Sequence, residues 1–350
     1  MCKVLVIDDS LFMRSLIPDM LNSDPEIEVI GTAKDGEDAI KKIPKIKPDC
    51  ITLDLAMPGW DGLTTLEHIM AKYPTPVVIL SAYSKKDADI TMKCLNAGAV
   101  SFVLKPSGEM SLDIESVKHE LIKQVKIASR VRLANIKPLI RKEAQRTTNY
   151  ELRTTNSKRR IIVIGASTGG PQTLEKVLSS LPVNLVLPVI IVQHAPSLFF
   201  TESLTEHLRK ACDLEVKVAE DKETLRAGTI YFAPAGFETR IVADKNTDNR
   251  RLSAKIRIEN PRKSALSPSI DITMESAAAA YKENTIGIIL TGMGRDGLQG
   301  MRAIKACGGA TLVQDESSLI FGMPKEVIDA GLADKVLPVE RIADEIMELV

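Results

Sequence analysis

Three residues in the second half of the chain could together activate a nucleophile. Ser167 lies in the segment GASTGG (165–170), directly after an apolar run, and His194 follows another such run. Asp296 lies in a glycine-rich turn after a third apolar run. A serine hydroxyl becomes nucleophilic when an imidazole accepts its proton and a carboxylate orients that imidazole. These residue types therefore predict acyl transfer if the fold brings them together.

The turn around Ser167 has two interpretations. Gly165 and Gly169 give the GxSxG spacing that exposes a nucleophilic serine between a strand and a helix. Gly165, Ser167 and Gly170 also approach the spacing of turns that bind phosphate at a helix N-terminus. This second interpretation would make the distal half a non-enzymatic switch that binds a nucleotide or docks a protein. The motif alone favours neither interpretation.

The base and the carboxylate also have alternatives. Residues 159–350 contain two histidines, and His207 lies on or beside the polar face of a helix pattern, so we expect it on the surface. His194 is then the candidate base. Asp296 has the position of the third member, although it would also suit the N-cap of a helix over 298–306. The chain order Ser, His, Asp differs from that of α/β-hydrolases, so the GxSxG spacing does not predict their fold.

A second set of polar residues follows apolar runs in the first half of the chain. Its members are Asp8, Asp9, Asp54, Ser81 and Lys105. Because the carboxyl ends of parallel strands meet at one edge of a sheet, we expect three carboxylates and one ammonium in a single crevice. Close carboxylates repel one another, and a hard divalent cation such as Mg²⁺ relieves that repulsion. With Mg²⁺ and Lys105 to neutralise an incoming phosphoryl group, Asp54 is a candidate acceptor.

The elements that must position these residues alternate between strand-like runs and helix-period segments. In the first half, the expected strands are Val4–Ile7, Val29–Ile30, Cys50–Leu53, Val77–Leu80 and Phe102–Leu104. In the second half, they include Ile161–Ile164, Val189–Val192, Thr229–Phe232 and Ile286–Leu290, with an antiparallel hairpin over Phe237–Val242 and Leu252–Ile258. The pattern predicts an α/β protein of two domains. The first is a flavodoxin-like (βα)5 domain, and the second is a doubly wound, mostly parallel sheet with that hairpin.

Composition and charge limit the class of protein. A chain of 350 residues is long enough for about two domains. Its 46 basic and 46 acidic residues cancel, which excludes a strong field for nucleic acid or an anionic membrane surface. No export signal or membrane-spanning stretch is recognisable. Five scattered cysteines without a CxxC pair argue against disulfides and zinc, so we expect a soluble protein of the reducing cytoplasm.

The helix and strand patterns fade between the two halves. Residues 137–160 contain eight Lys/Arg against two Asp/Glu, counted along the printed sequence. We interpret this segment as a solvated linker rather than a binding patch. The expected boundaries are residues 1–122 for the first domain, 123–158 for the basic linker and 159–350 for the second domain.

The first domain resembles response-regulator receiver domains over residues 1–122. The matching motifs are VIDDS (6–10), DLAMPGWDG (54–62), LSA (80–82) and LKP (104–106). By resemblance, the family's roles fall on Asp54 as phosphoacceptor, on Asp8, Asp9 and Asp54 as Mg²⁺ ligands, and on Ser81, Lys105 and Phe102 as switch residues. Packing in the core would explain Phe102 as well as the rotating aromatic residue of the family does.

The second domain resembles chemotaxis-type protein-glutamate methylesterases, the CheB family, over residues 159–347. The matching motifs are IGASTGGP (164–171), VQHAP (192–196), TGMGRDG (291–297), QDE (314–316) and FGMP (321–324). The order of receiver, linker and effector domain also matches this family. The resemblance implies that Ser167, His194 and Asp296 are the catalytic residues. It places the N–H groups that bind the oxyanion at Met293 and in the turn near Thr168.

The resemblance implies a phosphorylation-regulated hydrolase. Its expected reaction removes methyl groups from glutamate γ-methyl esters of chemotaxis receptors, and deamidation of receptor glutamines is a related acyl transfer. The implied partners are methyl-accepting chemotaxis receptors as substrate and a chemotaxis histidine kinase as phosphodonor, with no nucleic acid and no insertion into a membrane. Mg²⁺ is expected in the receiver domain and no cofactor in the esterase site.

Two segments depart from the family's pattern. After the strand at 229–234, the chain has Phe237 and Glu238 where the family commonly has a histidine-bearing stretch. Before Ser269, it has Ser267 and Pro268 where many members have Arg-Pro. We expect these departures to affect contacts with the substrate at the surface rather than the class of reaction.

Overall fold

The computed structural model describes residues 1–106, 114–131, 160–244, 253–261 and 267–350. The chain divides into two compact units, Met1–Lys142 and Glu143–Val350, and each has its own central sheet. Helix α5 (Ile114–Ala128) runs past residue 122, the expected end of the first domain. Most of the expected linker lies outside the described residues. Across the described part of the chain, no helix has both the length and the apolar character needed to cross a membrane.

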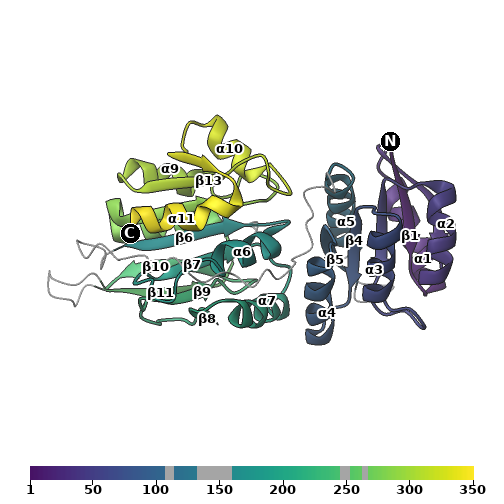
Figure 1. The fold of residues 1–350 in the computed structure, drawn as a ribbon, viewed down its shortest axis with the longest axis horizontal. Helices are drawn as coiled ribbons and strands as arrows, with labels where there is room; N and C mark the ends of the chain where they lie inside the picture. The colour runs from purple at the N-terminus through teal and green to yellow at the C-terminus, as the bar shows by residue number, and fades with distance from the viewer. Residues whose placement is uncertain (107–113, 132–159, 245–252, 262–266) are drawn as a thin grey trace. The chain divides into compact units, whose positions relative to one another are not determined.

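The first unit contains a five-stranded sheet in the order β2-β1-β3-β4-β5 (Figure 1). Its strands are β1 (Cys2–Ile7), β2 (Ile27–Ala33), β3 (Cys50–Asp54), β4 (Val77–Ser81) and β5 (Ser101–Leu104). The other helices of this unit are α1 (Leu11–Asn22), α2 (Gly36–Ile46), α3 (Gly62–Lys72) and α4 (Lys85–Asn96). All neighbouring strands pair in parallel, which confirms the predicted (βα)5 domain.

Burial and capping explain these elements. β3 and β4 are buried along their whole length, as central strands covered on both faces must be. Side-chain oxygens of Ser10, Asp35, Asp61 and Ser84 accept hydrogen bonds from backbone N–H groups at the starts of α1, α2, α3 and α4. The loop between each strand and the next helix therefore ends at a defined cap, and its polar residues stay at one edge of the sheet.

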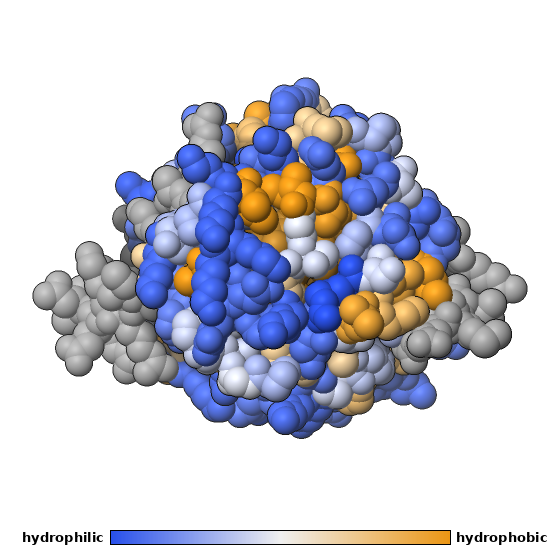
Figure 2. Space-filling view, turned by 90° about the vertical axis from the view of Figure 1, so that its right-hand side faces the viewer, coloured by the Kyte–Doolittle hydropathy of each residue, from blue (hydrophilic) through white to orange (hydrophobic). Residues whose placement is uncertain are grey.

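Figure 2 looks at the end of the first unit that carries α1 and α2 in Figure 1. Hydrophilic residues cover most of this face, and hydrophobic residues gather in smaller areas between them. Leu11 and Phe12, at the start of α1, are two of the exposed hydrophobic side chains of this unit. Exposed hydrophobic residues of this kind are common on folded proteins.

The second unit contains a seven-stranded sheet in the order β14-β13-β12-β6-β7-β9-β8, and a separate pair of strands, β10 and β11. The strands of the large sheet are β6 (Ile161–Ala166), β7 (Val189–Gln193), β8 (Glu215–Val218), β9 (Thr229–Phe232), β12 (Thr285–Ile289), β13 (Ala310–Gln314) and β14 (Lys335–Leu337). β10 (Glu238–Ala243) and β11 (Ala254–Glu259) pair antiparallel. The predicted parallel sheet and the predicted hairpin are both confirmed.

Six helices and one short 3₁₀ segment complete the described part of the second unit. They are α6 (Gly170–Leu178), α7 (Leu198–Ala211), α8 (Ile270–Tyr281), η3 (Lys282–Asn284), α9 (Leu298–Ala306), α10 (Met323–Asp329) and α11 (Val339–Leu349). Strands β8, β13 and β14 were not among the strands expected from sequence. β14 has three residues and β8 has an exposed first residue, so neither gives a strong hydrophobic pattern.

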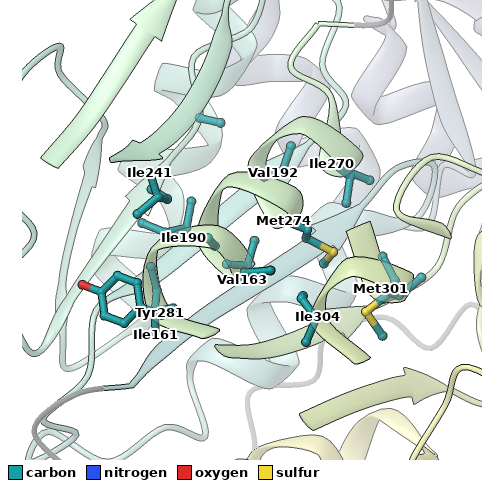
Figure 3. Close-up of a cluster of buried hydrophobic side chains, with 14 of the residues drawn as sticks. Ile161, Val163, Ile190, Val192, Ile241, Ile270, Met274, Tyr281, Met301 and Ile304 are labelled. Atoms are coloured by element: carbon teal, nitrogen blue, oxygen red, sulfur yellow. The ribbon is translucent and has the colours of Figure 1, made fainter. Parts of the chain in front are cut away.

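One face of the large sheet packs against α8, α9 and the hairpin (Figure 3). The buried cluster on this face contains Ile161 and Val163 of β6, Ile190 and Val192 of β7, Ile241 of β10, Met274 and Tyr281 of α8, and Met301 and Ile304 of α9. The residues of β6 and β7 alternate, because successive side chains of a strand point to opposite faces. This core holds α8 and α9 over the sheet, and the starts of both helices contribute to the site described next.

Candidate active site

Ser167, His194 and Asp296 form a hydrogen-bonded row in the second unit. Ser167 follows β6, His194 follows β7 and Asp296 follows β12, so each stands beyond the carboxyl end of a parallel strand. Nδ1 of His194 lies 3.2 Å from Oγ of Ser167. Nε2 of His194 lies 2.8 Å from Oδ2 of Asp296. The fold therefore brings together the three residues that sequence analysis proposed as a triad.

The imidazole of His194 has a defined role for each nitrogen. Nε2 faces a carboxylate, so it carries the hydrogen and donates to Asp296. Nδ1 then presents its lone pair to the hydroxyl of Ser167. In the serine-protease template the carboxylate holds the other nitrogen, Nδ1. In this protein the two ring nitrogens have exchanged these roles, with Nε2 bound to the carboxylate and Nδ1 facing the serine. The ring still places a proton acceptor next to the serine oxygen.

Asp296 is held by the N-terminus of α8. Its carboxylate accepts hydrogen bonds from the N–H groups of Ile270 and Asp271, and Oγ of Ser269 donates to its Oδ1 at 3.1 Å. The alternative that Asp296 is the N-cap of the helix over 298–306 is wrong, because the N-cap of α9 is Gly297, although Oδ1 of Asp296 also accepts a hydrogen bond from the N–H of Gly297. Burial alone would raise the pKa of Asp296, but hydrogen bonding and charge from His194, with the backbone N–H groups, lower it below its ordinary value.

Asp271 makes the reciprocal contact. Its Oδ1 accepts a hydrogen bond from the N–H of Gly300 in the first turn of α9. Burial and the charge of Asp296 raise the pKa of Asp271. The start of α8 therefore binds the carboxylate of Asp296, which precedes α9, and the start of α9 binds the carboxylate of Asp271 in α8. These reciprocal contacts hold the two helix starts, and Asp296 between them, in place.

Gln193 is a further residue of the site that sequence analysis missed. It is the last residue of β7 and is 5% exposed. Its Nε2 donates to the carbonyl oxygens of Ser167 and His194, at 2.9 Å in each case. The amide thus ties the serine turn to the histidine strand. A buried polar residue at the end of a parallel strand is the signal that could have identified it.

The glycines of the serine turn make room for protein side chains rather than for phosphate. A Cβ on Gly170 would lie 1.8 Å from Oε1 of Gln193, and a Cβ on Gly169 would lie 2.8 Å from Cδ2 of Leu319. An amide oxygen beside the first residue of α6 would repel an anion bound there. The geometry therefore disfavours a phosphate-binding turn and favours a turn that exposes Ser167.

The predicted oxyanion donors lie close to Ser167. A Cβ on Gly292 would lie 2.7 Å from Cβ of Ser167, so the backbone that leads into Met293 passes beside the serine. Oγ1 of Thr291 donates to the carbonyl oxygen of Thr168 at 2.9 Å, which joins the two turns. Within the described residues, the N–H groups of Thr168 and Met293 have no hydrogen-bond partner. Both are therefore free to bind an oxyanion.

One of two expectations about surface residues needs correction. The side chain of His207 is 31% exposed, so it reaches the surface as expected, and its Nε2 lies 2.7 Å from Glu175 Oε2. Glu238 is 2% exposed and accepts a hydrogen bond from Oγ of Ser267. The two departures from the family's pattern thus meet in the interior, and a substrate cannot contact Glu238 at the surface. Phe237, at 37% exposure, is the exposed member of that segment.

The acidic site of the first unit is also assembled. One ligand atom from each of Asp8, Asp9 and Asp54 lies within 4.8 Å of the others. Nζ of Lys105 lies 2.8 Å from both Asp8 Oδ2 and Asp54 Oδ1. Burial and the nearby Asp54 raise the pKa of Asp8, although Lys105 opposes this shift. Three carboxylates at this spacing fit a hard cation with oxygen ligands, such as Mg²⁺.

The two remaining predicted switch residues lie on the neighbouring strands. Ser81 is the buried last residue of β4, next to β3 and Asp54 in the sheet. Its Oγ accepts a hydrogen bond from Oγ1 of Thr91 in α4 at 3.0 Å and donates to the carbonyl oxygen of Ala82 at 3.3 Å. Phe102 of β5 is half-buried. Its partial exposure leaves both interpretations of Phe102 open.

Two protein-family models match the chain. The model of the CheB methylesterase matches residues 162–346, which is more than half of the chain. The chain belongs to the CheB methylesterase family. The model of the response regulator receiver domain matches residues 4–115 of this CheB-family chain. Both resemblances drawn from the sequence motifs are confirmed.

Curated relatives of this CheB-family chain share its full length. The protein-glutamate methylesterase/protein-glutamine glutaminase of Halalkalibacterium halodurans is 41% identical over 353 aligned residues, which cover 99% of this chain and 97% of the relative. The protein of the same name from Archaeoglobus fulgidus is 42% identical, with 99% and 97% coverage.

A solved structure supports the fold of the second unit. The crystal structure of the Thermotoga maritima CheB methylesterase catalytic domain is 40% identical and covers 55% of this chain and 98% of its own, with a TM-score of 0.52. The aligned region covers nearly all of that solved chain, which is described as the catalytic domain.

Proposed function

We propose that this protein hydrolyses the γ-methyl esters of glutamate residues in methyl-accepting chemotaxis receptors, and deamidates receptor glutamines by the same chemistry. The observation that carries the proposal is the row of hydrogen bonds from Ser167 through His194 to Asp296. The names of the full-length relatives specify the same pair of activities. Five free cysteines and the kinase partner proposed below favour the cytoplasm as the place of reaction.

The reaction begins at the serine oxygen. Oγ of Ser167 bonds to the ester carbonyl carbon while Nδ1 of His194 takes the hydroxyl proton, and the carbonyl electron pair moves to its oxygen. The imidazolium then gives its proton to the methoxy oxygen, the bond from carbon to that oxygen breaks, and methanol leaves. Water attacks the acyl-enzyme with the same nitrogen as base, which releases glutamate and restores Ser167. With a glutamine substrate the leaving group is ammonia.

Charge in the transition state is stabilised at both ends of the row. Asp296 stabilises the imidazolium that forms on His194. The N–H groups of Thr168 and Met293 are the proposed donors to the oxyanion, because both are unpaired among the described residues and lie in the turns beside the serine. One such donor contributes roughly 3–4 kcal/mol to lowering the barrier.

The test of this proposal is methanol release from methylated receptor. Ser167→Ala should abolish release, because no other group in the row can form the acyl-enzyme. Ser180→Ala, an exposed serine beyond the end of α6, is the matched control and should keep the wild-type rate. Methanol release by the Ser167→Ala variant at the control rate would rule out this mechanism.

The first unit is the proposed regulatory site. Asp54 accepts a phosphoryl group from a histidine kinase, and Asp8, Asp9 and Asp54 would hold Mg²⁺. When bound, the ion neutralises negative charge on the transferring phosphoryl group. Lys105 holds the carboxylates of Asp8 and Asp54 together and offers its ammonium to a phosphoryl oxygen.

Ser81 connects phosphorylation to the rest of the receiver. Its hydroxyl already exchanges hydrogen bonds with Ala82 and Thr91. A turn of Ser81 toward a phosphoryl group on Asp54 would break its hydrogen bond with Thr91 and leave Oγ1 of Thr91 bonded to the carbonyl oxygen of Asp87. It would thereby change the contact between β4 and the middle of α4. The proposed consequence is that the unphosphorylated receiver restrains the serine site and that phosphorylation relieves this restraint.

A further inference from the structure

Glu238 is a buried carboxylate behind the triad. It is the first residue of β10 and is 2% exposed. Oε1 accepts a hydrogen bond from Oγ of Ser267 at 2.7 Å, and Oε2 accepts one from the N–H of Ser269 at 3.0 Å. Both carboxylate oxygens of Glu238 therefore bind the segment 267–269, which leads into α8.

Ser269 carries this contact to the triad. It is the N-cap of α8, and its Oγ accepts a hydrogen bond from the N–H of Ile272 at 3.3 Å. The hydroxyl hydrogen is then available to Oδ1 of Asp296, which lies 3.1 Å from Oγ. Glu238 fixes the backbone of Ser269, and Ser269 fixes one oxygen of Asp296.

Hydrogen bonds between β10 and α8 hold the backbone around Glu238 in place. Oγ1 of Thr273 in α8 donates to the carbonyl oxygen of Thr239 at 2.8 Å. The N–H of Ile241 donates to Oγ of Ser276 in α8 at 2.9 Å. β10 is thus joined to α8 at Thr273 and at Ser276, so a shift of Glu238 would strain its contacts with the helix.

We propose that Glu238 is a positioning residue that sets the orientation of Asp296, and through it that of His194, by holding Ser267 and Ser269 at the start of α8. The inference rests on the proposed hydrolase function. The contact runs from Glu238 to Ser269, then to Asp296 and to His194, with a hydrogen bond at every step. A small displacement of a catalytic group lowers the rate steeply, so loss of the Glu238 carboxylate should affect the chemical step more than substrate binding.

Three variants of the full chain test the proposal. Glu238→Ala removes both acceptors, so kcat for methanol release should fall roughly tenfold to hundredfold with KM nearly unchanged. Glu238→Gln keeps an acceptor for the N–H of Ser269 and should restore most of the lost rate. Glu345→Ala removes another buried carboxylate of the same unit, one that pairs with Lys335, and serves as the control for stability. It should lower the melting temperature without changing kcat.

Proton NMR gives a signal from the triad hydrogen bond that a change in stability alone would not alter. The hydrogen between Nε2 of His194 and Asp296 should give a strongly downfield signal in the wild-type protein and in Glu238→Gln. It should weaken or shift in Glu238→Ala and remain in Glu345→Ala. An unchanged signal and kcat in Glu238→Ala, beside an active wild-type protein, would overturn the inference. A wild-type protein that releases no methanol would instead overturn the proposed function.

Discussion

His194 is held on both sides of its ring by partners from distant parts of the chain. Asp296 fixes Nε2, Ser167 faces Nδ1, and Gln193 binds the carbonyl oxygen of His194 itself. An imidazole fixed in this way loses little freedom when the reaction begins, because its tautomer and its orientation are already set. Proton transfer from Ser167 to His194 depends on Asp296 being charged, because the carboxylate stabilises the imidazolium that forms.

The charge of Asp296 predicts a dependence of stability on pH. Since the folded pKa of Asp296 lies below its ordinary value of 3.8, the charged form stabilises the folded protein above that pH. This stabilisation is lost as the pH falls through the lowered pKa. Asp296→Asn cannot titrate, and its amide would face the N–H groups of Ile270 and Asp271, so we expect a loss of about 1–3 kcal/mol at neutral pH.

The measurement is the free energy of unfolding of the second unit, from denaturant titrations across the acidic range. The difference between the wild-type protein and Asp296→Asn should narrow as the pH falls below about 3.8. The exposed residue Asp329 gives a control, because Asp329→Asn should show no such difference at neutral pH. A difference that stays constant with pH would contradict a lowered pKa.

Sequence located the reacting residues but not the residues that hold them. Ser167, His194 and Asp296 each follow an apolar run, and parallel strands end at one edge, so their meeting could be predicted. Glu238 and Gln193 act through backbone groups up to 31 residues away along the chain, and such pairings leave no spacing signal. The same reason explains why Asp296 was also compatible with capping α9, when it is bound to α8.

At the scale of elements, the site depends on where helices begin. α8 and α9 start against Asp296 and Asp271, and α6 starts directly after the serine turn. Buried strands such as β6 and β7 were predictable, because continuous apolar runs are typical of parallel sheets. β14, with three residues, carries too little pattern to be recognised.

Gly170 at the start of α6 gives a test at this scale. A Cβ there would lie 1.8 Å from Oε1 of Gln193, so Gly170→Ala should push the Gln193 amide away from the carbonyl oxygens of Ser167 and His194. We expect kcat for methanol release to fall by roughly tenfold or more. The comparison is Gly331→Ala, where no atom lies within 4 Å of the added Cβ.

Gly331 has a φ of 68°, so this control costs only backbone strain of about 1–2 kcal/mol. It should lower the melting temperature and leave kcat unchanged. Equal losses of kcat in the two variants would mean that the serine turn does not depend on the Gln193 amide.

At the scale of the whole molecule, each site is complete within one unit. The acidic site lies in the first unit and the serine row in the second, and each belongs to a separate sheet. The two-domain organisation was predictable, because the strand pattern fades between two α/β series. Coupling between the two units leaves no local sequence pattern, because each site is formed by residues that follow the strands of its own sheet.

The regulatory proposal predicts the rate of the catalytic unit by itself. Residues 159–350 should release methanol roughly 5- to 150-fold faster than the unphosphorylated full chain, the usual range of coupling between two sites. A small-molecule phosphoryl donor with Mg²⁺ should raise the rate of the full chain toward that value. Chelation of Mg²⁺, or Asp54→Asn, should prevent the increase. Equal rates for the catalytic unit and the unphosphorylated full chain would contradict the proposal that the receiver restrains the serine site.

The central claim is that the hydrogen-bonded row makes Ser167 a nucleophile. The most direct measurement is labelling of the phosphorylated full chain with a serine-directed phosphonate, followed by mass mapping of the adduct. The account predicts a single adduct on Ser167 and its loss in His194→Ala, with His207→Ala labelled like the wild-type protein. An adduct on a different serine, or labelling of Ser167 that is unchanged in His194→Ala, would contradict it.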